Sequence, residues 1–89
     1  MYLFIDINIE QIRHLMLKGL YKKAHNSSKL LLNMSKQRLT KDHYYLGKIL
    51  VINGESALGL ENYKRAYDAY RLALMVFERF EGDESVIYN

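Results

Sequence analysis

The sequence predicts an all-α fold of two antiparallel helix pairs stacked as a short α-solenoid, and three observations lead to this prediction. The 89 residues contain no Pro, no Trp and only 5 Gly, while 49% are hydrophobic, a composition typical of a helical globular chain. Apolar residues recur at spacings of three and four, the period of an amphipathic helix. Finally, LYKKAHNSSKLLL at 20–32 returns as NYKRAYDAYRLAL at 62–74, with the tyrosines 42 residues apart (63 − 21 = 42).

A chain of this length is expected to form a single domain, which we place at residues 1–89. It can bury only about 60 to 65% of its unfolded surface, so we expect a binding partner to complete its core. The absence of Cys rules out disulfides and fits a reducing intracellular compartment, nuclear or cytoplasmic. The apolar start MYLFIDINI is interrupted by Asp6 and lacks a basic region, and no run approaches the roughly 20 residues that span a bilayer. No membrane association is therefore predicted.

The first helix pair is expected at about residues 8–34. Asn8 can cap a helix from about Ile9 to Lys18, with Gln11 reaching back to it as in a capping box. Gly19 can then adopt the left-handed conformation that ends a helix. The second helix is predicted from about Tyr21 to Met34. Its buried face is predicted to consist of Ala24, Ser28, Leu31 and Leu32.

The second helix pair is expected at about residues 41–80, after a polar connector at 35–40. Thr40 can cap its first helix, with Asp42 in the first turn, where a negative charge meets the positive end of the helix dipole. This helix is predicted to continue to about Leu58.

The last helix follows a tight turn. Gly59 and the LEN after it are expected to make this turn, and Asn62 can cap the helix that follows. The helix should fray after Phe80 and leave an acidic tail at 81–89. Its apolar stripe is predicted to consist of Tyr63, Ala66, Tyr67, Tyr70, Ala73, Leu74 and Phe77.

Small and aromatic residues of the second pair fall at a characteristic spacing, and on this spacing the pair resembles a tetratricopeptide repeat. In that family, small side chains let neighbouring helices approach closely and an aromatic ring fills the adjoining space. The first pair departs from the pattern, with Ser28 in place of the aromatic, and Glu78 stands where a closing Pro is usual. The first pair therefore resembles a degenerate or terminal repeat. The residues expected to pack the repeats are Tyr21, Ala24, Leu31, Leu50, Gly54, Ala57, Tyr63, Ala66, Tyr70 and Ala73.

A narrower resemblance rests on GLY at 19–21, LLLNMS at 30–35 and GESALGLENYKRAYDAYRLAL at 54–74. Together these segments are similar to the amino-terminal region of the subunit 7 family of the anaphase-promoting complex (cyclosome), cell-cycle scaffold proteins built from tetratricopeptide repeats. The resemblance implies a homodimer formed through amino-terminal repeats and membership of a large ubiquitin ligase complex. It implies no catalysis by the chain itself.

The resemblance also implies two candidate protein-binding surfaces. In the family, the first helix of each pair lines a concave groove that can take an extended peptide or a partner helix. The matching groove positions here are Ile9, Arg13, Met16, Lys48, Val51, Glu55 and Leu58. A second copy would instead pack on the apolar start and on small residues, for which the candidates are Leu3, Phe4, Ser27 and Ser28.

No catalytic residue, metal site, cofactor or small-molecule substrate is predicted. His14, His25 and His43 have no metal-ligand spacing such as HExxH, and no Cys accompanies them. The glycines follow no phosphate-binding pattern. The tyrosines of the last helix alternate with Lys and Arg and could stack on bases, but they fall on a stripe that we expect in the core.

Charge is divided unevenly along the chain. Residues 1–50 carry 9 Lys/Arg against 3 Asp/Glu, and residues 51–89 carry 4 against 7. This division favours a charge-complementary protein over a uniform nucleic-acid patch. The sequence thus predicts a non-catalytic scaffold and protein-interaction module. Two alternatives stay open: another tetratricopeptide adaptor, of a chaperone or trafficking system, that binds a partner peptide, and a small RNA-binding helical domain with strongly salt-dependent affinity.

Overall fold

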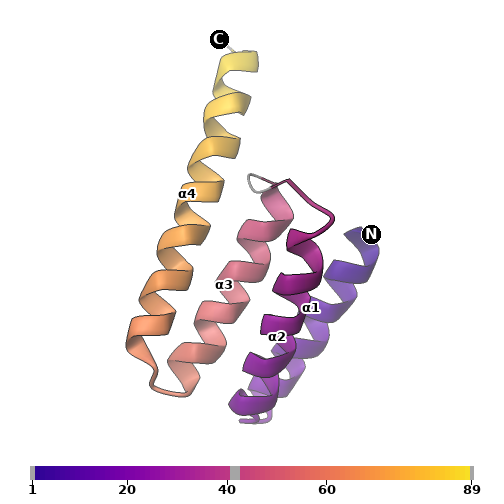
Figure 1. Ribbon diagram of the computed structural model, residues 1–89, viewed down its shortest axis with the longest axis vertical. Coiled ribbons are helices and arrows are strands. Elements are labelled where there is room, and N and C mark those ends of the chain that lie inside the picture. Colours follow the sequence, from indigo (N-terminus) through magenta and orange to yellow (C-terminus); the bar gives the residue numbers. More distant parts are fainter. Residues whose placement is uncertain (1, 41–42, 89) are drawn as a thin grey trace.

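Four helices make up the part of the chain that the computed structural model describes, which is residues 2–40 and 43–88, with side chains described as far as Phe80. They are α1 (Tyr2–Leu17), α2 (Tyr21–Lys36), α3 (Tyr44–Gly59) and α4 (Tyr63–Tyr88), and these ranges contain no strand (Figure 1). The predicted all-α class is confirmed. Because α3 starts 42 residues after α1, and α4 starts 42 residues after α2, the offset between the sequence repeats is also the offset between the helix pairs.

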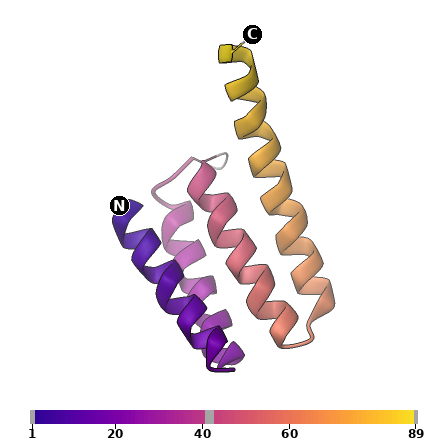
Figure 2. The ribbon, with the colours of Figure 1, turned by 180° about the vertical axis from the view of Figure 1, so that it is seen from behind.

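Helix α3 is the centre of the molecule. It contacts α1, α2 and α4, while within the described residues α4 contacts α3 alone. Figures 1 and 2 show the α1–α2 hairpin on one side of α3 and α4 on the other. Ile5, Ile49 and Ile52 are completely buried, and each buried side chain of this size contributes about 1.5 to 3 kcal/mol. The other buried apolar residues are Ile9, Ile12, Ala24, Leu31, Leu32, Leu46, Leu50, Ala57, Ala66, Ala69, Ala73 and Val76.

Helix α1 begins at Tyr2 and not at about Ile9, so the predicted start is wrong. Asn8 lies inside the helix, where its Nδ2 donates to the Phe4 carbonyl at 2.8 Å instead of capping. Ile5 precedes Ile9 by one turn on the same buried face of α1. Burial of Ile5 in the added segment stabilises the helix more than a local capping signal does, because most helical stability in proteins comes from tertiary packing.

Gly19 ends α1 as predicted. Its φ is 78°, and the amides of Gly19 and Leu20 donate to the carbonyls of Met16 and Leu15, both at 2.9 Å. This is a Schellman motif, in which a left-handed residue lets two amides satisfy carbonyls of the last helical turn. The chain reverses within three residues, and α2 begins at Tyr21.

Helix α2 continues to Lys36, two residues beyond the predicted end at Met34. The predicted connector at 35–40 is therefore shorter, because Ser35 is fully buried on the face of α2 that also carries Leu31 and Leu32. The predicted burial of Ala24, Ser28, Leu31 and Leu32 is confirmed.

The N-terminus of α3 is capped by His43 and not by Thr40. The backbone amide of Tyr45 donates to His43 Nδ1 at 3.2 Å, and the Nε2 side of the ring lies 2.8 Å from the Tyr2 hydroxyl of α1. Thr40 lies three residues earlier, where its carbonyl accepts from the His43 amide at 3.0 Å. The predicted role of Asp42 falls outside the described residues.

The turn between α3 and α4 depends on Glu61, whose φ is 61°. The amides of Glu61 and Asn62 donate to the carbonyls of Leu58 and Ala57, both at 2.9 Å, which forms a second Schellman motif. Gly59 is the last helical residue and is not left-handed. The predicted cap of α4 is confirmed, since the Arg65 amide donates to Asn62 Oδ1 at 3.2 Å.

Gly59 permits close helix packing, as the sequence predicts for the glycines at 47, 54 and 59. A Cβ at this position would collide with the Tyr21 ring at the start of α2, so glycine permits the close approach of these two elements. In the same way, the rings of Tyr70 and Phe77 on α4 lie against Gly54 and Gly47 of α3. These contacts are the close packing of small and aromatic residues that the sequence predicted for Gly54 and Tyr70.

The apolar stripe predicted for α4 is only partly buried. Tyr63 and Tyr67 are 64% and 65% exposed and Leu74 is 57% exposed, so their predicted places in the core are wrong. In the first pair, His25 occupies the position equivalent to Tyr67 and is bonded to Ser56 of α3, the helix that follows α2. No described helix follows α4 in the same way, so Tyr67 faces solvent, whereas Tyr70, the equivalent of Ser28, packs on Gly54 of α3.

Helix α4 runs to Tyr88 and does not end after Phe80. Figure 1 shows its last turns projecting past the ends of the other helices. The segment predicted as an acidic tail at 81–89 is therefore helical through Tyr88, and Asn89 lies outside the described residues.

Candidate protein-binding groove

A groove lies between the C-terminal ends of α1 and α3, and we call it the α1–α3 groove. Figure 2 shows these two helices together on one side of the molecule, with α2 behind α1. The groove encloses about 560 Å³. Its lining consists of Arg13, Met16, Leu17, Tyr21, Glu55, Leu58 and Gly59.

The periodicity of α1 explains why its side chains reach this groove. Ile5, Ile9 and Ile12 face the core, which turns Arg13 and Leu17 toward α3. Leu17 is 86% exposed, although it is a large apolar residue next to the Schellman turn.

The two walls of the groove differ in charge. Arg13 stands on the α1 side, where it forms an ion pair with Glu10 at 2.9 Å, and Glu55 stands on the α3 side. Between them lie apolar side chains, including Leu58, which is 47% exposed. A groove with an apolar base and opposite charges on its walls can hold an apolar side chain of a peptide and orient the polar groups beside it.

Four of the seven predicted groove residues come together here: Arg13, Met16, Glu55 and Leu58. The prediction that Ile9 lines the groove is wrong, because Ile9 is only 2% exposed and packs in the core. Ile9 lies one turn after Ile5 in the buried stripe of α1, which also contains Ile12. Lys48 and Val51 lie outside the lining; Val51 is half-buried and packs against the core.

Three lining residues were missed: Leu17, Tyr21 and Gly59. Leu17 and Gly59 occupy equivalent positions of the 42-residue repeat, at the last turns of α1 and α3. That equivalence was the signal available in the sequence. The meeting of these turns with the Tyr21 ring is a tertiary contact that no local pattern contains.

Lys48 takes part in a polar cluster that joins α1 to α3. Its Nζ donates to Asp6 Oδ1 at 3.2 Å, and the Tyr45 hydroxyl donates to Asp6 Oδ2 at 3.0 Å. The hydrogen bond to Asp6, followed by burial, raises the pKa of Tyr45. The Tyr2 ring stacks on Tyr45 at 4.9 Å between centroids, so the cluster positions the start of α1 on α3.

A second polar cluster lies between α2 and α3. His25 Nδ1 lies 2.9 Å from Ser56 Oγ, which donates to the Asn53 carbonyl at 2.8 Å; because Ser56 donates there, His25 Nδ1–H is the donor to Ser56. Asn53 Nδ2 donates to Ser28 Oγ at 2.9 Å. Burial, followed by the charges of Arg65 and Lys29, lowers the pKa of His25.

The candidates for a dimer surface separate into two groups. Leu3 and Phe4 are 72% and 43% exposed, so they are accessible. The prediction that Ser28 lies on a dimer surface is wrong, because Ser28 is fully buried. Its Oγ donates to the His25 carbonyl and accepts from Asn53 Nδ2 of α3. Ser27 is half-buried.

The first two turns of α1 expose three apolar side chains, Leu3, Phe4 and Ile7, which we call the α1 outer face, and the turns after them expose Glu10, Gln11 and His14. Ile7 is 50% exposed, and a shallow depression of about 620 Å³ extends from it along the helix toward His14 and Leu15. Helix α1 contacts α2 and α3 through its opposite face.

Comparison with protein-family models, curated proteins and solved structures gave no match. Within the described part of the chain, no group of three or more His, Cys, Asp or Glu side chains is placed to hold a metal ion. No helix among the described residues combines the length and apolarity that crossing a membrane requires.

Proposed function

We propose that this chain is a non-catalytic protein-interaction module in which the two helix pairs act as tetratricopeptide-like repeats. The support is that α3 packs on both helices of the first pair, as the first helix of a following repeat must. We propose further that the chain forms a homodimer within a scaffold subunit of the anaphase-promoting complex type, as its sequence resemblance implies. No catalytic step is assigned to it.

The exposed α1 outer face is the observation that carries the homodimer proposal. Three large apolar side chains gather there at one end of a chain whose core is small. Removing apolar surface from water contributes about 25 cal/mol per Å², and stacked helix pairs bury more of it than an isolated set does. A second copy that covers this face would therefore add core to both copies.

Sedimentation equilibrium over a concentration series tests this proposal. The unaltered chain is expected to dimerise, and Ile7→Glu is expected to shift it to monomer because a charge would be buried in the interface. The control is Leu74→Glu, the same chemical change at a residue of similar exposure on α4, which does not contact α1. A folded monomer at every concentration, or equal effects of the two variants, would contradict a dimer through α1.

The α1–α3 groove supports a second candidate function, the binding of a partner peptide by a tetratricopeptide adaptor. The exposure of Leu17 and Leu58 on facing walls is the observation that favours it. Peptides selected from a random library on the unaltered chain should bind Leu17→Ala/Leu58→Ala about tenfold or more weakly, since each truncation removes apolar contact area. Leu30→Ala, an exposed leucine of α2 outside the groove lining, is the control. If the double variant binds as tightly as the control, the groove is not the peptide site.

A further inference from the structure

A second groove lies on the other side of the molecule, and we call it the α2–α4 groove. Helices α2 and α4 both pack on α3 without contacting each other, so α3 forms a floor between them. Leu46 and Leu50 make the floor, with Leu32 on the α2 side and Leu72 and Met75 on the α4 side. The space is about 430 Å³, and its apolar walls remain accessible, since Leu72 is 47% and Met75 41% exposed.

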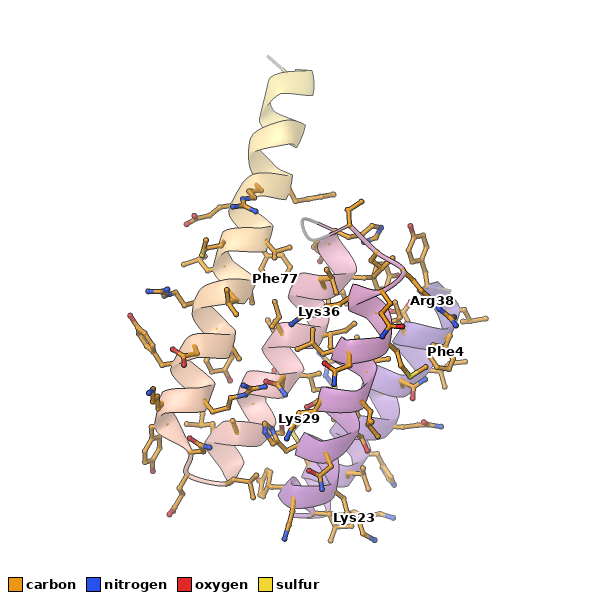
Figure 3. All side chains as sticks on the ribbon, in the orientation of Figure 1. Phe4, Lys23, Lys29, Lys36, Arg38 and Phe77 are labelled. Atoms are coloured by element: carbon orange, nitrogen blue, oxygen red, sulfur yellow. The ribbon has the colours of Figure 1, made fainter. Side chains whose placement is uncertain are left out.

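Basic side chains line both edges of this groove. Lys36 lines it from α2 and Arg79 from α4. Lys29 lies two turns before Lys36 on the same face of α2, and Figure 3 shows both lysines extending from α2 over α3 in the direction of α4. Arg65 is exposed and lies two turns before Leu72 along α4, outside the lining.

Among the residues whose side chains the structure describes, no acidic residue lines the groove. Helix α4 carries two carboxylates between Arg65 and Arg79, and both stand outside the lining. Glu78 belongs to a separate depression with Tyr44 and Leu74 on another side of α4. Asp68 is exposed and precedes Leu72 by one helical turn, so it lies beyond the lining at the Arg65 end of α4. Within the lining, the apolar floor is bordered by Lys36 on one side and Arg79 on the other.

We propose that the α2–α4 groove binds an acidic amphipathic helix of a partner protein. Apolar side chains at i, i+3, i+4 and i+7 of that helix would lie on Leu46, Leu50 and Leu72, with Glu or Asp on both flanks meeting the basic edges. The length agrees: Lys29 and Lys36 are about 10 Å apart along α2, and Arg65 and Arg79 about 21 Å along α4, which correspond to two to four helical turns. This proposal stands apart from the homodimer and from the α1–α3 groove.

The chemistry of the lining distinguishes a helix from RNA. Single-stranded nucleic acid binds in basic channels that offer aromatic side chains for base stacking. The lining of the α2–α4 groove is aliphatic between its charged edges and contains no aromatic residue. The exposed tyrosines Tyr63 and Tyr67 lie outside the lining.

Fluorescence anisotropy with synthetic peptides tests the proposal on the full chain. The probe is a labelled peptide of about 18 residues, five helical turns, with Leu at i, i+3, i+4 and i+7 and Glu on both flanks. We expect saturable binding that weakens as salt is raised, and no binding of the same peptide with Lys in place of Glu. Equal binding of the two peptides would overturn the proposal.

Two charge-reversal variants locate the binding. Lys29→Glu/Lys36→Glu should raise the Kd of the acidic peptide about tenfold or more, because both attractions become repulsions. Lys23→Glu/Arg38→Glu makes the same change of charge at the two ends of α2, where Figure 3 shows both side chains away from the groove, and should leave Kd nearly unchanged. Equal weakening by both variants would show that affinity depends on the net charge of the chain, and it would overturn the assignment of the binding to the α2–α4 groove.

A third variant examines the apolar wall that α4 contributes, and two further measurements examine rival occupants. Leu72→Ser/Met75→Ser changes exposed residues, so circular dichroism should show an intact fold while peptide affinity falls. An oligouridine that binds the unaltered chain as tightly as the acidic peptide would overturn the proposal in favour of RNA. Conversion of a dimer to monomer by Lys29→Glu/Lys36→Glu would assign the groove to a second copy and overturn the partner helix.

Discussion

Ser28 and Asn53 form a buried hydrogen bond that links α2 to α3 at the centre of the molecule. Asn53 is 1% exposed, and its Oδ1 has no hydrogen-bond partner among the described residues, while its Nδ2 donates to Ser28 Oγ. A buried polar group without a partner costs more than the hydrogen bond contributes when it is made. The pair therefore selects one register of α2 on α3, since any shift would leave the amide unpaired.

Substitution of Ser28 tests this account. Ser28→Ala removes the acceptor of Asn53 Nδ2, and we expect the free energy of unfolding to fall by about 1 to 3 kcal/mol in urea denaturation. The double variant Ser28→Ala/Asn53→Leu removes both polar groups and should be more stable than Ser28→Ala alone. If the double variant is the less stable of the two, the amide makes another interaction that the hydrogen bond to Ser28 does not represent.

His25 gives the stability of the protein a dependence on pH. Its pKa in the folded chain is lowered from 6.5, first by burial and then by Arg65 and Lys29, so below about pH 6.5 the unfolded chain binds more protons than the folded one. This contribution to stability is fully present above the unfolded pKa and is lost as pH falls through the lower folded pKa. Unfolding curves at several pH values should therefore show a smaller loss on acidification for His25→Gln than for the unaltered chain, and an equal loss would contradict this role of His25.

At the scale of the helices, two residues in the left-handed conformation end α1 and α3. Gly19 and Glu61 occupy equivalent positions in their Schellman motifs, with φ of 78° and 61°. Only Gly19 is free of the steric cost that a side chain brings to this conformation. The turn between α3 and α4 is thus the more strained of the two.

Substitutions at these two positions should have opposite effects on the free energy of unfolding. Gly19→Ala is expected to lower the free energy of unfolding by about 1 kcal/mol through backbone strain alone, because a Cβ there meets no atom within 4 Å. Glu61→Gly is expected to raise it by about 0.5 to 1 kcal/mol, after the greater freedom of Gly in the unfolded chain is counted. Thermal unfolding followed by circular dichroism measures both. Destabilisation by Glu61→Gly would mean that the carboxylate has a stabilising role in the turn.

At the scale of the whole molecule, α3 makes the four helices one cooperative unit. Every other helix packs on it, and Ile49 and Ile52 are completely buried. A domain of this size has a net stability of only about 4 to 13 kcal/mol. Loss of packing at the centre of α3 should therefore weaken all four helices together.

Ile49→Ala provides the test. We expect a loss of about 2 to 5 kcal/mol, from the deleted methyl and methylene groups and the cavity they leave. Leu30→Ala, at a residue that is 65% exposed, should stay within about 0.5 kcal/mol of the unaltered chain. Circular dichroism and tyrosine fluorescence should give the same midpoint in urea, whereas separate midpoints would show that the helix pairs unfold independently.

Features of this protein that depend on local chemistry could be predicted from the sequence alone. The all-α class, the 42-residue offset of the helix pairs, the left-handed turn at Gly19 and the cap at Asn62 follow from composition, periodicity and turn residues, because these act over a few neighbouring positions. Four groove residues, among them Arg13 and Glu55, were predicted through the family resemblance. These positions could be predicted because they depend only on which face of one helix pair packs against the next pair.

Which apolar faces are covered depends on the packing of helices that are distant in the sequence. A period of three and four residues identifies a stripe but not the element that packs on it, so Tyr63 and Tyr67 were predicted in the core and lie in solvent. In the same way, Ile9 lies in the core and not in the groove, because it follows Ile5 by one turn in the buried stripe of α1. The α2–α4 groove likewise exists because two helices separated in the sequence stand apart on α3, a spacing set by packing against a third helix.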